Sequence, residues 1–210
     1  MSKTFAINTI KHPFIWEGLL RLSFLLFLLS FSVSLFAQNA DNIYKEAKEL
    51  YDAKNYSQAV PKLKVAAQKG HKKAQYRLGR CYEKGRGVEK DATVAFQWYT
   101  KSAAQDYAKG LYALGNCYKE GLGTAKDHKK AFECFTKAAQ HDNADAQYQL
   151  GKCYMKGKGT TADAKKAASW FKKAVSNEKD GKDIIAKLRK KASEGDEDAK
   201  NIMKLAGVKP

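Results

Sequence analysis

Four cysteines and four histidines are the side chains of this sequence that could bind a metal ion or form disulfide bonds. The histidines are scattered, and the sequence contains neither a CxxC nor an HExxH motif. Such short spacings matter because the ligands of a zinc ion must all converge on one point. We therefore expect no metal site and no other cofactor. The histidines are His12, His71, His128 and His141.

Three of the cysteines, Cys81, Cys117 and Cys153, lie 36 residues apart. If they occupy equivalent helices, as argued below, the helix between them keeps them beyond disulfide reach of one another. The spacing allows one pairing, Cys117 with Cys134 across a single helix pair. The alternative is that all four cysteines are small, buried apolar side chains.

The same 36-residue spacing runs through the middle of the sequence. LGRCYEKGRG at 78–87 returns as LGNCYKEGLG at 114–123 and as LGKCYMKGKG at 150–159. A fixed period of this length indicates a solenoid, in which each unit buries its apolar face only by stacking on its neighbours. Because a solenoid needs a copy in every unit and an enzyme does not, we interpret the copies as structural.

Each unit contains two segments with apolar residues at helical spacing, which predicts a pair of helices. Between them, Gly85 is expected to end the first helix in the left-handed conformation, and Asp91 to cap the second. Gly87 is expected to let the connecting loop turn. Gly79 lies inside the first helix, where glycine costs up to about 1 kcal/mol relative to alanine, so we expect a neighbouring helix to approach closely there.

The pattern AxxxLGxxYxxGxGVxxDxxxAxxWYxKxA, read from Ala74 to Ala103, resembles the SEL-one-like repeat, a 36-residue relative of the tetratricopeptide repeat. The resemblance covers residues 71–177, with Gly110 replacing the first alanine and Cys134 replacing the tryptophan in the second copy. It implies an all-α fold, a right-handed α-solenoid of helix-turn-helix repeats.

We expect three such repeats, at residues 71–106, 107–142 and 143–178. Residues 38–70 lack four residues of the glycine-containing loop and resemble a plain tetratricopeptide repeat. Residues 179–210 predict a C-terminal helical cap, whose many charges suit the exposed end of a solenoid.

Residues 1–37 resemble an export signal, because basic residues precede an apolar run that ends at Ala37. Only 16 residues follow Arg21 in this run, fewer than the roughly 20 that span a membrane. We predict cleavage after Ala37 and a periplasmic or secreted protein, with a retained membrane anchor as the alternative.

The formal net charge is +17, and cleavage would remove three positive charges and Glu17, leaving +15. Such a charge favours anionic partners without choosing among them. Since nucleic acid is the least accessible anion for an exported protein, we expect an acidic protein or peptide partner. We expect no nucleic acid and no membrane contact beyond the export signal.

The positions of the first helices that packing does not use are the candidate binding surface. Overlaid on a tetratricopeptide repeat, they line the concave face, with tyrosine in one column and cationic or amide groups in the next. Both chemistries are typical of protein interfaces, although the tyrosines could instead pack against the neighbouring repeat. The predicted partner-binding residues are Lys73, Tyr76, Arg80, Lys109, Tyr112, Asn116, Lys119, Tyr148, Lys152 and Lys156.

The family resemblance implies a non-enzymatic scaffold for protein interactions. Some exported relatives are linked to penicillin binding or weak β-lactamase activity, and Ser169 and Lys172 form the SxxK spacing of that chemistry. The equivalent segments read QWYT and ECFT, and no SDN or KTG motif accompanies the pair, so we predict a solvated helix face. A cell-wall or β-lactam hydrolase and a binder of anionic envelope polymers are the alternatives.

Overall fold

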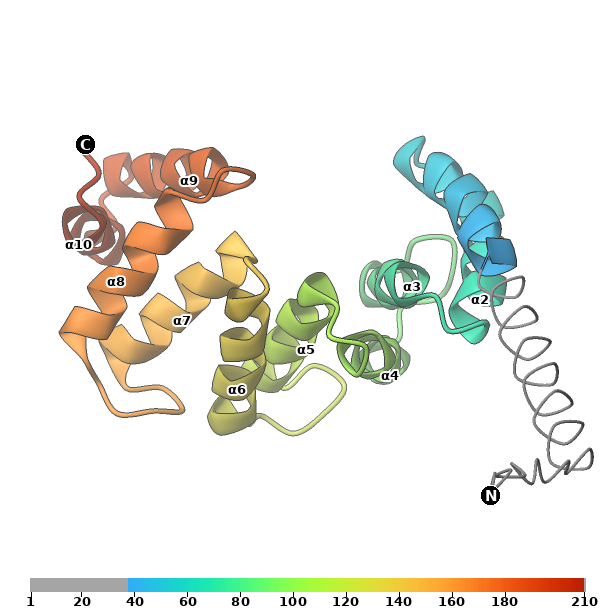
Figure 1. Ribbon diagram of the computed structural model, residues 1–210, viewed down its shortest axis with the longest axis horizontal. Helices are drawn as coiled ribbons and strands as arrows, with labels where there is room; N and C mark the ends of the chain where they lie inside the picture. Colours follow the sequence, from blue (N-terminus) through green and yellow to red (C-terminus); the bar gives the residue numbers. More distant parts are fainter. Residues whose placement is uncertain (1–37, 210) are drawn as a thin grey trace, which may run out of the picture. The chain divides into compact units, whose positions relative to one another are not determined.

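The computed structural model describes residues 38–209, and within them the secondary structure is helical, without strands (Figure 1). The predicted export signal at residues 1–37 lies outside the described residues. No helix in the described range is long and apolar enough to cross a membrane. Residues 38–52 are helical, and they are followed by α2 (Tyr56–Gln68), α3 (Lys72–Lys84), α4 (Ala92–Ala103), α5 (Ala108–Glu120), α6 (His128–Gln140), α7 (Ala144–Lys156), α8 (Ala164–Val175), α9 (Gly181–Ser193) and α10 (Glu197–Ala206).

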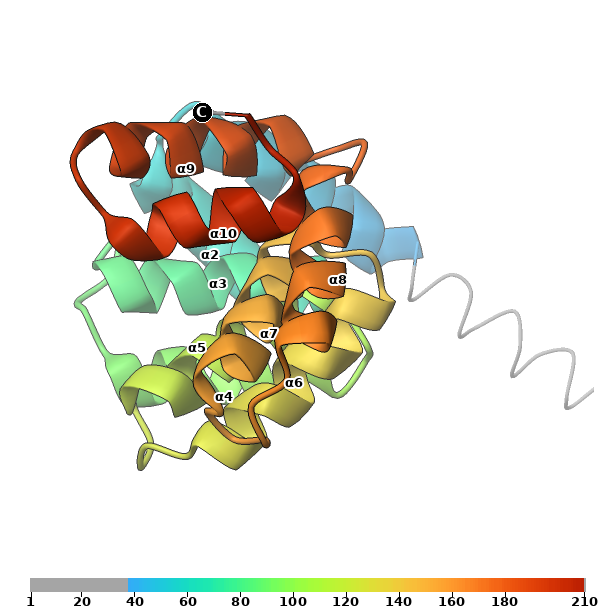
Figure 2. The same ribbon diagram turned by 90° about the vertical axis from the view of Figure 1, so that its left-hand side faces the viewer.

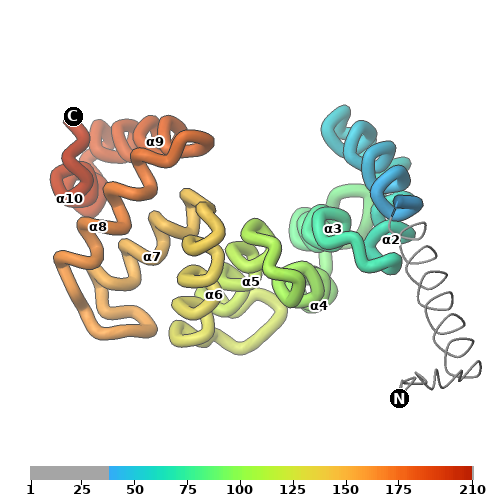
Figure 3. The backbone as a smooth tube through the Cα atoms, viewed as in Figure 1, coloured from blue at the N-terminus to red at the C-terminus, as the bar shows by residue number. Residues whose placement is uncertain are grey.

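The helices pack in the order in which they occur in the chain. Within repeats, α3 contacts α4, α5 contacts α6, and α7 contacts α8; between repeats, each second helix contacts the next first helix. Figure 3 follows the backbone through this succession of helix pairs. The fold is therefore an all-α solenoid with a C-terminal helical cap, which confirms the predicted fold class.

A glycine in each first helix lies against an aromatic ring of the second helix. A Cβ atom on Gly79 would lie 2.7 Å from Tyr99 Cδ1, and one on Gly115 would lie 2.6 Å from Phe135 Cε1. Gly151 meets Phe171 in the same way, and the three rings are at most 1% exposed. Because even one methyl group would overlap the ring, glycine is needed at this position. The predicted close approach at Gly79 is confirmed.

The residues between the paired helices also have the predicted conformations. Gly85, Gly121 and Gly157 end the first helices with φ of 65°, 76° and 64°. Asp91 caps α4 by accepting a hydrogen bond from the Val94 amide at 2.9 Å, and the equivalent aspartates cap α6 and α8. These caps confirm the roles assigned to Gly85 and Asp91.

The second glycine of each loop has a role beyond the predicted turn. Gly87 lies against the backbone of Tyr56, and Gly123 against that of Ala92, at the start of the preceding second helix. Each loop therefore packs closely on the unit before it, and this contact helps to set the stacking of neighbouring units.

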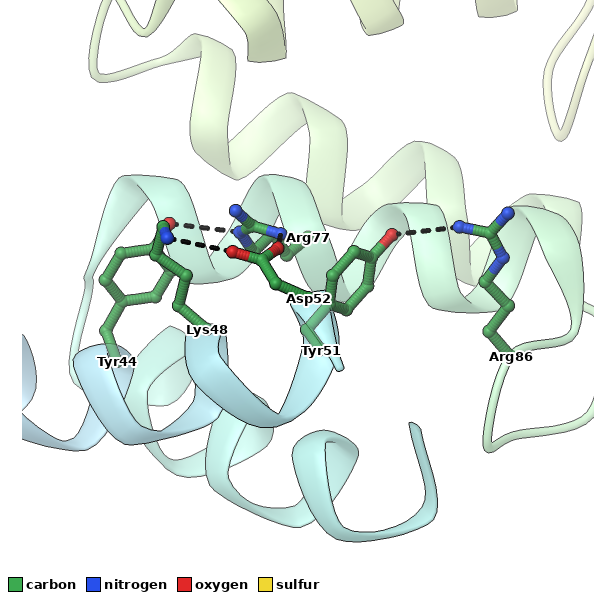
Figure 4. Close-up of polar contacts among 6 residues, drawn as sticks. All are labelled: Tyr44, Lys48, Tyr51, Asp52, Arg77 and Arg86. Atoms are coloured by element: carbon green, nitrogen blue, oxygen red, sulfur yellow. Dashed lines mark hydrogen bonds and ion pairs between the residues drawn. The ribbon is translucent and has the colours of Figure 1, made fainter. Parts of the chain in front are cut away.

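Polar contacts join the helix at residues 38–52 to α3 (Figure 4). Arg77 donates hydrogen bonds to the Tyr44 hydroxyl at 3.1 Å and to Asp52 at 3.0 Å. Lys48 donates a hydrogen bond to Asp52 at 2.8 Å. This bond, together with the charge and the single hydrogen bond of Arg77, holds the pKa of the Asp52 carboxyl below its ordinary value. In the loop after α3, Arg86 donates a hydrogen bond to the Tyr51 hydroxyl at 3.3 Å. This network attaches the first helix pair to the repeats.

The C-terminal helices α9 and α10 lie beside each other and cover the end of α8 (Figure 2). Ile184 and Leu188 of α9 and Ile202 and Met203 of α10 are buried in one cluster with Phe171. The cap therefore removes from water the apolar face that a further repeat would otherwise cover.

We predict that Gly115→Ala destabilises the fold, although alanine is the better helix former. The added methyl group would overlap the Phe135 ring, and overpacking of this kind costs about 1–3 kcal/mol, which exceeds the gain of up to about 1 kcal/mol in helix propensity. Urea unfolding monitored by circular dichroism measures the difference. Combining the change with Phe135→Leu should recover part of the loss, and an unfolding free energy at or above wild type for Gly115→Ala would contradict the close-packing argument.

We also predict that His71 makes stability depend on pH. His71 Nδ1 accepts the Ala74 amide of α3 at 3.1 Å, its Nε2 lies 3.1 Å from Asp41, and its ring stacks on Tyr44. Burial lowers the pKa of His71 in the fold although Asp41 opposes the change, so below the ordinary pKa of about 6.5 the unfolded chain binds a proton that the folded chain resists. The free energy of unfolding should therefore fall as pH drops below about 6.5.

His71→Asn is the matched control, because Asn143 caps α7 at the equivalent position, where Ala146 N to Oδ1 is 2.8 Å. The variant should be less stable than wild type at pH 8, because it loses the contacts with Tyr44 and Asp41, and it should lose less further stability than wild type between pH 7 and pH 5. Identical pH profiles for the two proteins would show that His71 does not carry this dependence.

Candidate partner-binding face

Five of the predicted partner-binding residues line one hollow between α3 and α5. It has a volume of about 470 Å³, and Asp145 of α7 lies at its border. We call the surface built by α3, α5 and α7 the first-helix face. The residues brought together in this hollow are Tyr76, Arg80, Tyr112, Asn116 and Lys119.

A second hollow, of about 220 Å³, lies between α7 and the cap helix α9. Tyr112 borders this hollow as well as the first, and Tyr148 lies beside it. Its other wall comes from Ile184, Leu188 and the lysines of α9. The repeat pattern does not predict this wall, because the cap residues do not follow it.

The remaining predicted residues divide into two groups. Lys152 and Lys156 line a third hollow, between α5, α6 and α7, which Lys119 also reaches. Lys73 and Lys109 are exposed in the first turns of α3 and α5 and border none of these three hollows. The first-helix face thus gathers eight of the ten residues around three neighbouring hollows.

The tyrosine column both packs and lines the hollows. The ring centroid of Tyr76 lies 6.0 Å from that of Tyr99, Tyr112 lies 5.9 Å from Phe135, and Tyr148 lies 5.8 Å from Phe171. Each tyrosine thus contacts the second helix of its own repeat, and it remains half-buried. Burial raises the pKa of Tyr148 to about 12, so these hydroxyl groups stay protonated near neutral pH. Each tyrosine ring thus packs against an aromatic ring of the second helix and also borders a surface hollow.

The first-helix face is not uniformly positive. Around the hollow between α3 and α5, three cationic residues stand against three carboxylates. Glu83 accepts a hydrogen bond from the Tyr99 hydroxyl at 2.6 Å and pairs with Lys84 at 2.7 Å. Excess positive charge is instead found at the hollow between α5 and α7. The balanced set around the first hollow is Arg80, Lys84 and Lys119 with Glu83, Glu120 and Asp145.

The four cysteines are free thiols, so the structure contains no bond between Cys117 and Cys134. Cys81, Cys117 and Cys153 are buried, and burial raises the pKa of Cys117 to about 12 and of Cys81 to about 11. A thiol with such a pKa is a poor nucleophile near neutral pH. The interpretation of the repeated cysteine as a small buried side chain is confirmed.

Ser169 and Lys172 are both exposed on α8. Nothing in the described part of the chain surrounds them with the burial that shifts the pKa of a catalytic group, and no group of His, Cys, Asp or Glu there could hold a metal ion.

We predict that Tyr99→Phe destabilises the protein by about 1–2 kcal/mol, because Glu83 loses a short hydrogen bond. The next repeat shows which background to use as a control, because it has Phe135 at the position of Tyr99 and Lys119 at the position of Glu83. In a Glu83→Lys background, Tyr99→Phe should leave the free energy of unfolding almost unchanged. Urea unfolding of the four proteins measures the coupling, and an equal loss in both backgrounds would contradict it.

Comparison with known proteins connects this geometry to a family. The profile described as the Sel1 repeat matches residues 72–107, 108–143 and 144–178. A search of curated proteins finds no match.

Two of the matching solved structures illustrate the shared fold. The crystal structure of a Sel1 repeat protein from Oxalobacter formigenes is 36% identical, with a TM-score of 0.62, over 65% of this chain and 56% of that one. The protective antigen c5321 of uropathogenic Escherichia coli is 24% identical, with a TM-score of 0.66, over 83% of this chain and 40% of that one. The matched part is thus about half the length of these relatives.

Sel1 repeats commonly serve as scaffolds for protein–protein interactions and are typically non-enzymatic. The three consecutive matches span half of the chain and coincide with the helix pairs α3–α4, α5–α6 and α7–α8. The chain belongs to the Sel1 repeat family.

Proposed function

We propose that this chain is an exported, non-enzymatic scaffold that captures an extended, acidic segment of a partner protein along the first-helix face. The observation that carries the proposal is the gathering of Tyr76, Arg80, Tyr112, Asn116 and Lys119 around one hollow. Solenoids typically bind extended partners along the surface that their repeats build together. The basic, apolar character of residues 1–37 supports export.

The partner's chemistry follows from how the side chains are distributed. The hollow between α3 and α5 offers tyrosine rings and an amide with balanced charge, which suits backbone and uncharged side chains. The hollow between α5 and α7 is lined by Lys119, Lys152 and Lys156, which suits carboxylates. An extended segment bound across both would place its acidic residues near α7.

We predict that Arg80→Glu with Lys152→Glu weakens capture of an acidic peptide by at least tenfold, because reversed charges repel the carboxylates. The probe is a fluorescein-labelled peptide of alternating glutamate and glycine, followed by fluorescence polarisation. Lys45→Glu with Lys165→Glu is the matched control, since both lysines are exposed and lie outside the hollows of the first-helix face. Equal weakening by both pairs would show that the overall charge of the chain binds the peptide.

Tyr112→Ser separates peptide capture from binding of anionic envelope polymers. Capture of the peptide should weaken severalfold in this variant, because Tyr112 borders two of the hollows. Polymer binding through charge alone would be unaffected by the tyrosine and would disappear as salt is raised. Unchanged peptide binding by the folded variant would remove the tyrosines from the proposal.

A further inference from the structure

A pocket with an unusually concentrated positive charge lies between α5, α6 and α7. Its volume is about 190 Å³, and its floor is formed by Ala131, Phe135 and Cys153. Five lysines stand around this apolar floor against a single carboxylate, Glu120, which gives a net charge of +4. We call it the lysine pocket. Its lysines are Lys119, Lys126, Lys152, Lys156 and Lys158, with His128 beside them.

The repeat architecture does not require these charges. The positions 36 residues earlier have the same backbone setting between α3, α4 and α5, but they hold two glutamates and two lysines and are neutral overall. Four lysines of the pocket are replaced there by other residue types. Lys119, Lys152, Lys156 and Lys158 correspond to Glu83, Asn116, Glu120 and Leu122.

The pocket keeps most of its charge uncompensated. Lys119 pairs with Glu120 at 3.1 Å, and Lys156 pairs with Asp198 of α10. Lys126, Lys152 and Lys158 form no ion pair with any residue of the described part of the chain. Lys126 and Lys158 are exposed at the rim of the pocket, whereas Lys152 is half-buried in its wall.

Lys152 shows the electrostatic consequence most clearly. It is half-buried, and its Nζ lies 5.8 Å from the centroid of the Tyr148 ring. Burial lowers the pKa of Lys152, and the nearby charges of Lys119, Lys156 and Lys191 lower it further, although Asp198 opposes the change. A bound anion would relieve this repulsion, because it would bring negative charge close to the Lys152 ammonium group.

The size and charge of the pocket indicate which anion would fit. A volume of about 190 Å³ is below the range of roughly 300–1,000 Å³ that is typical of drug-sized ligands, so the ligand must be compact. A carboxylate supplies one negative charge and two oxygens, whereas a phosphoryl group supplies nearly two charges and three acceptor oxygens. Three ammonium groups without an ion-pair partner match the phosphoryl group better than the carboxylate, because each ammonium is a compact point charge that suits phosphate.

We infer that the lysine pocket is a binding site for a compact phosphate-class oxyanion, held by Lys126, Lys152 and Lys158 above an apolar floor. The ligand is inorganic phosphate or pyrophosphate, or the phosphoryl group of a small phosphomonoester. The lysine pocket is the hollow between α5 and α7 to which the proposed function assigns the partner's carboxylates. The inference concerns a small free anion, and pyrophosphate binding can fail while capture of the acidic peptide is retained.

Isothermal titration calorimetry of the full chain with pyrophosphate tests the inference. Lys152→Asn with Lys158→Leu introduces residues that the chain itself carries at the equivalent positions, Asn116 and Leu122. This double variant should bind pyrophosphate at least tenfold more weakly than wild type. Lys45→Asn with Lys165→Leu removes the same charge from exposed helix surfaces and should bind within about twofold of wild type.

Three results would overturn the inference. They are wild-type affinity in the folded pocket variant, an equal loss in the control pair, and binding of succinate as tight as that of pyrophosphate. Circular dichroism confirms folding, and Lys158→Leu alone, a change in a loop, keeps the test valid if Lys152→Asn does not fold.

A further titration distinguishes the two sources of the anion. Tighter binding of phenyl phosphate than of inorganic phosphate would identify a phosphomonoester whose organic part contacts Phe135. The reverse order would identify the free anion.

Discussion

The close approach of each first helix to an aromatic ring of its partner determines most of this structure. At Gly79, Gly115 and Gly151 the missing side chain lets the rings of Tyr99, Phe135 and Phe171 lie close against the first helix. This contact sets the distance between the two helices, and the loop glycines set the contact with the preceding unit. Because both contacts are made by constant residues, each unit stacks in the same way whatever the remaining positions hold.

That constancy leaves the other positions of the first helices free to differ. Neighbouring repeats have residues of different charge at equivalent positions. Glu83 corresponds to Lys119, and Asn116 corresponds to Lys152. The earlier setting gives a hollow with balanced charge, and the later setting gives a pocket with a large excess of positive charge. One backbone thus presents two chemistries side by side, and binding specificity in such a chain resides in the residues that do not repeat.

The parts of the fold that recur could be predicted from the sequence, because three copies reveal which positions packing constrains. The helix pairs, the left-handed glycines such as Gly85, the aspartate caps and the close approach at Gly79 were all predicted on this basis. The predicted binding residues rested on the same alignment of copies, which is why most of them do meet around neighbouring hollows.

Features built from residues that occur once were missed. The contacts of Arg77 with Tyr44 and Asp52 join segments 25 or more residues apart and have no counterpart in the other repeats. The cap wall near Ile184 has no counterpart in the other copies, and the loop residue Lys158 is replaced there by other residue types, so the repeat pattern predicts neither of them. A table of charges at equivalent positions would have revealed the lysine pocket, because that comparison needs no coordinates.

The repeats thus divide into constant positions that stack the units and variable positions that bind. Backbone amide chemical shifts of the isotope-labelled chain, recorded while the acidic peptide is titrated, test this division most directly. We predict that the shifts change along α3, α5 and α7, at Arg80, Asn116 and Lys152, and stay constant on the outer surfaces of α4, α6 and α8. Changes spread evenly over exposed lysines of all helices would contradict the account, because they would show that charge alone, without a built face, holds the partner.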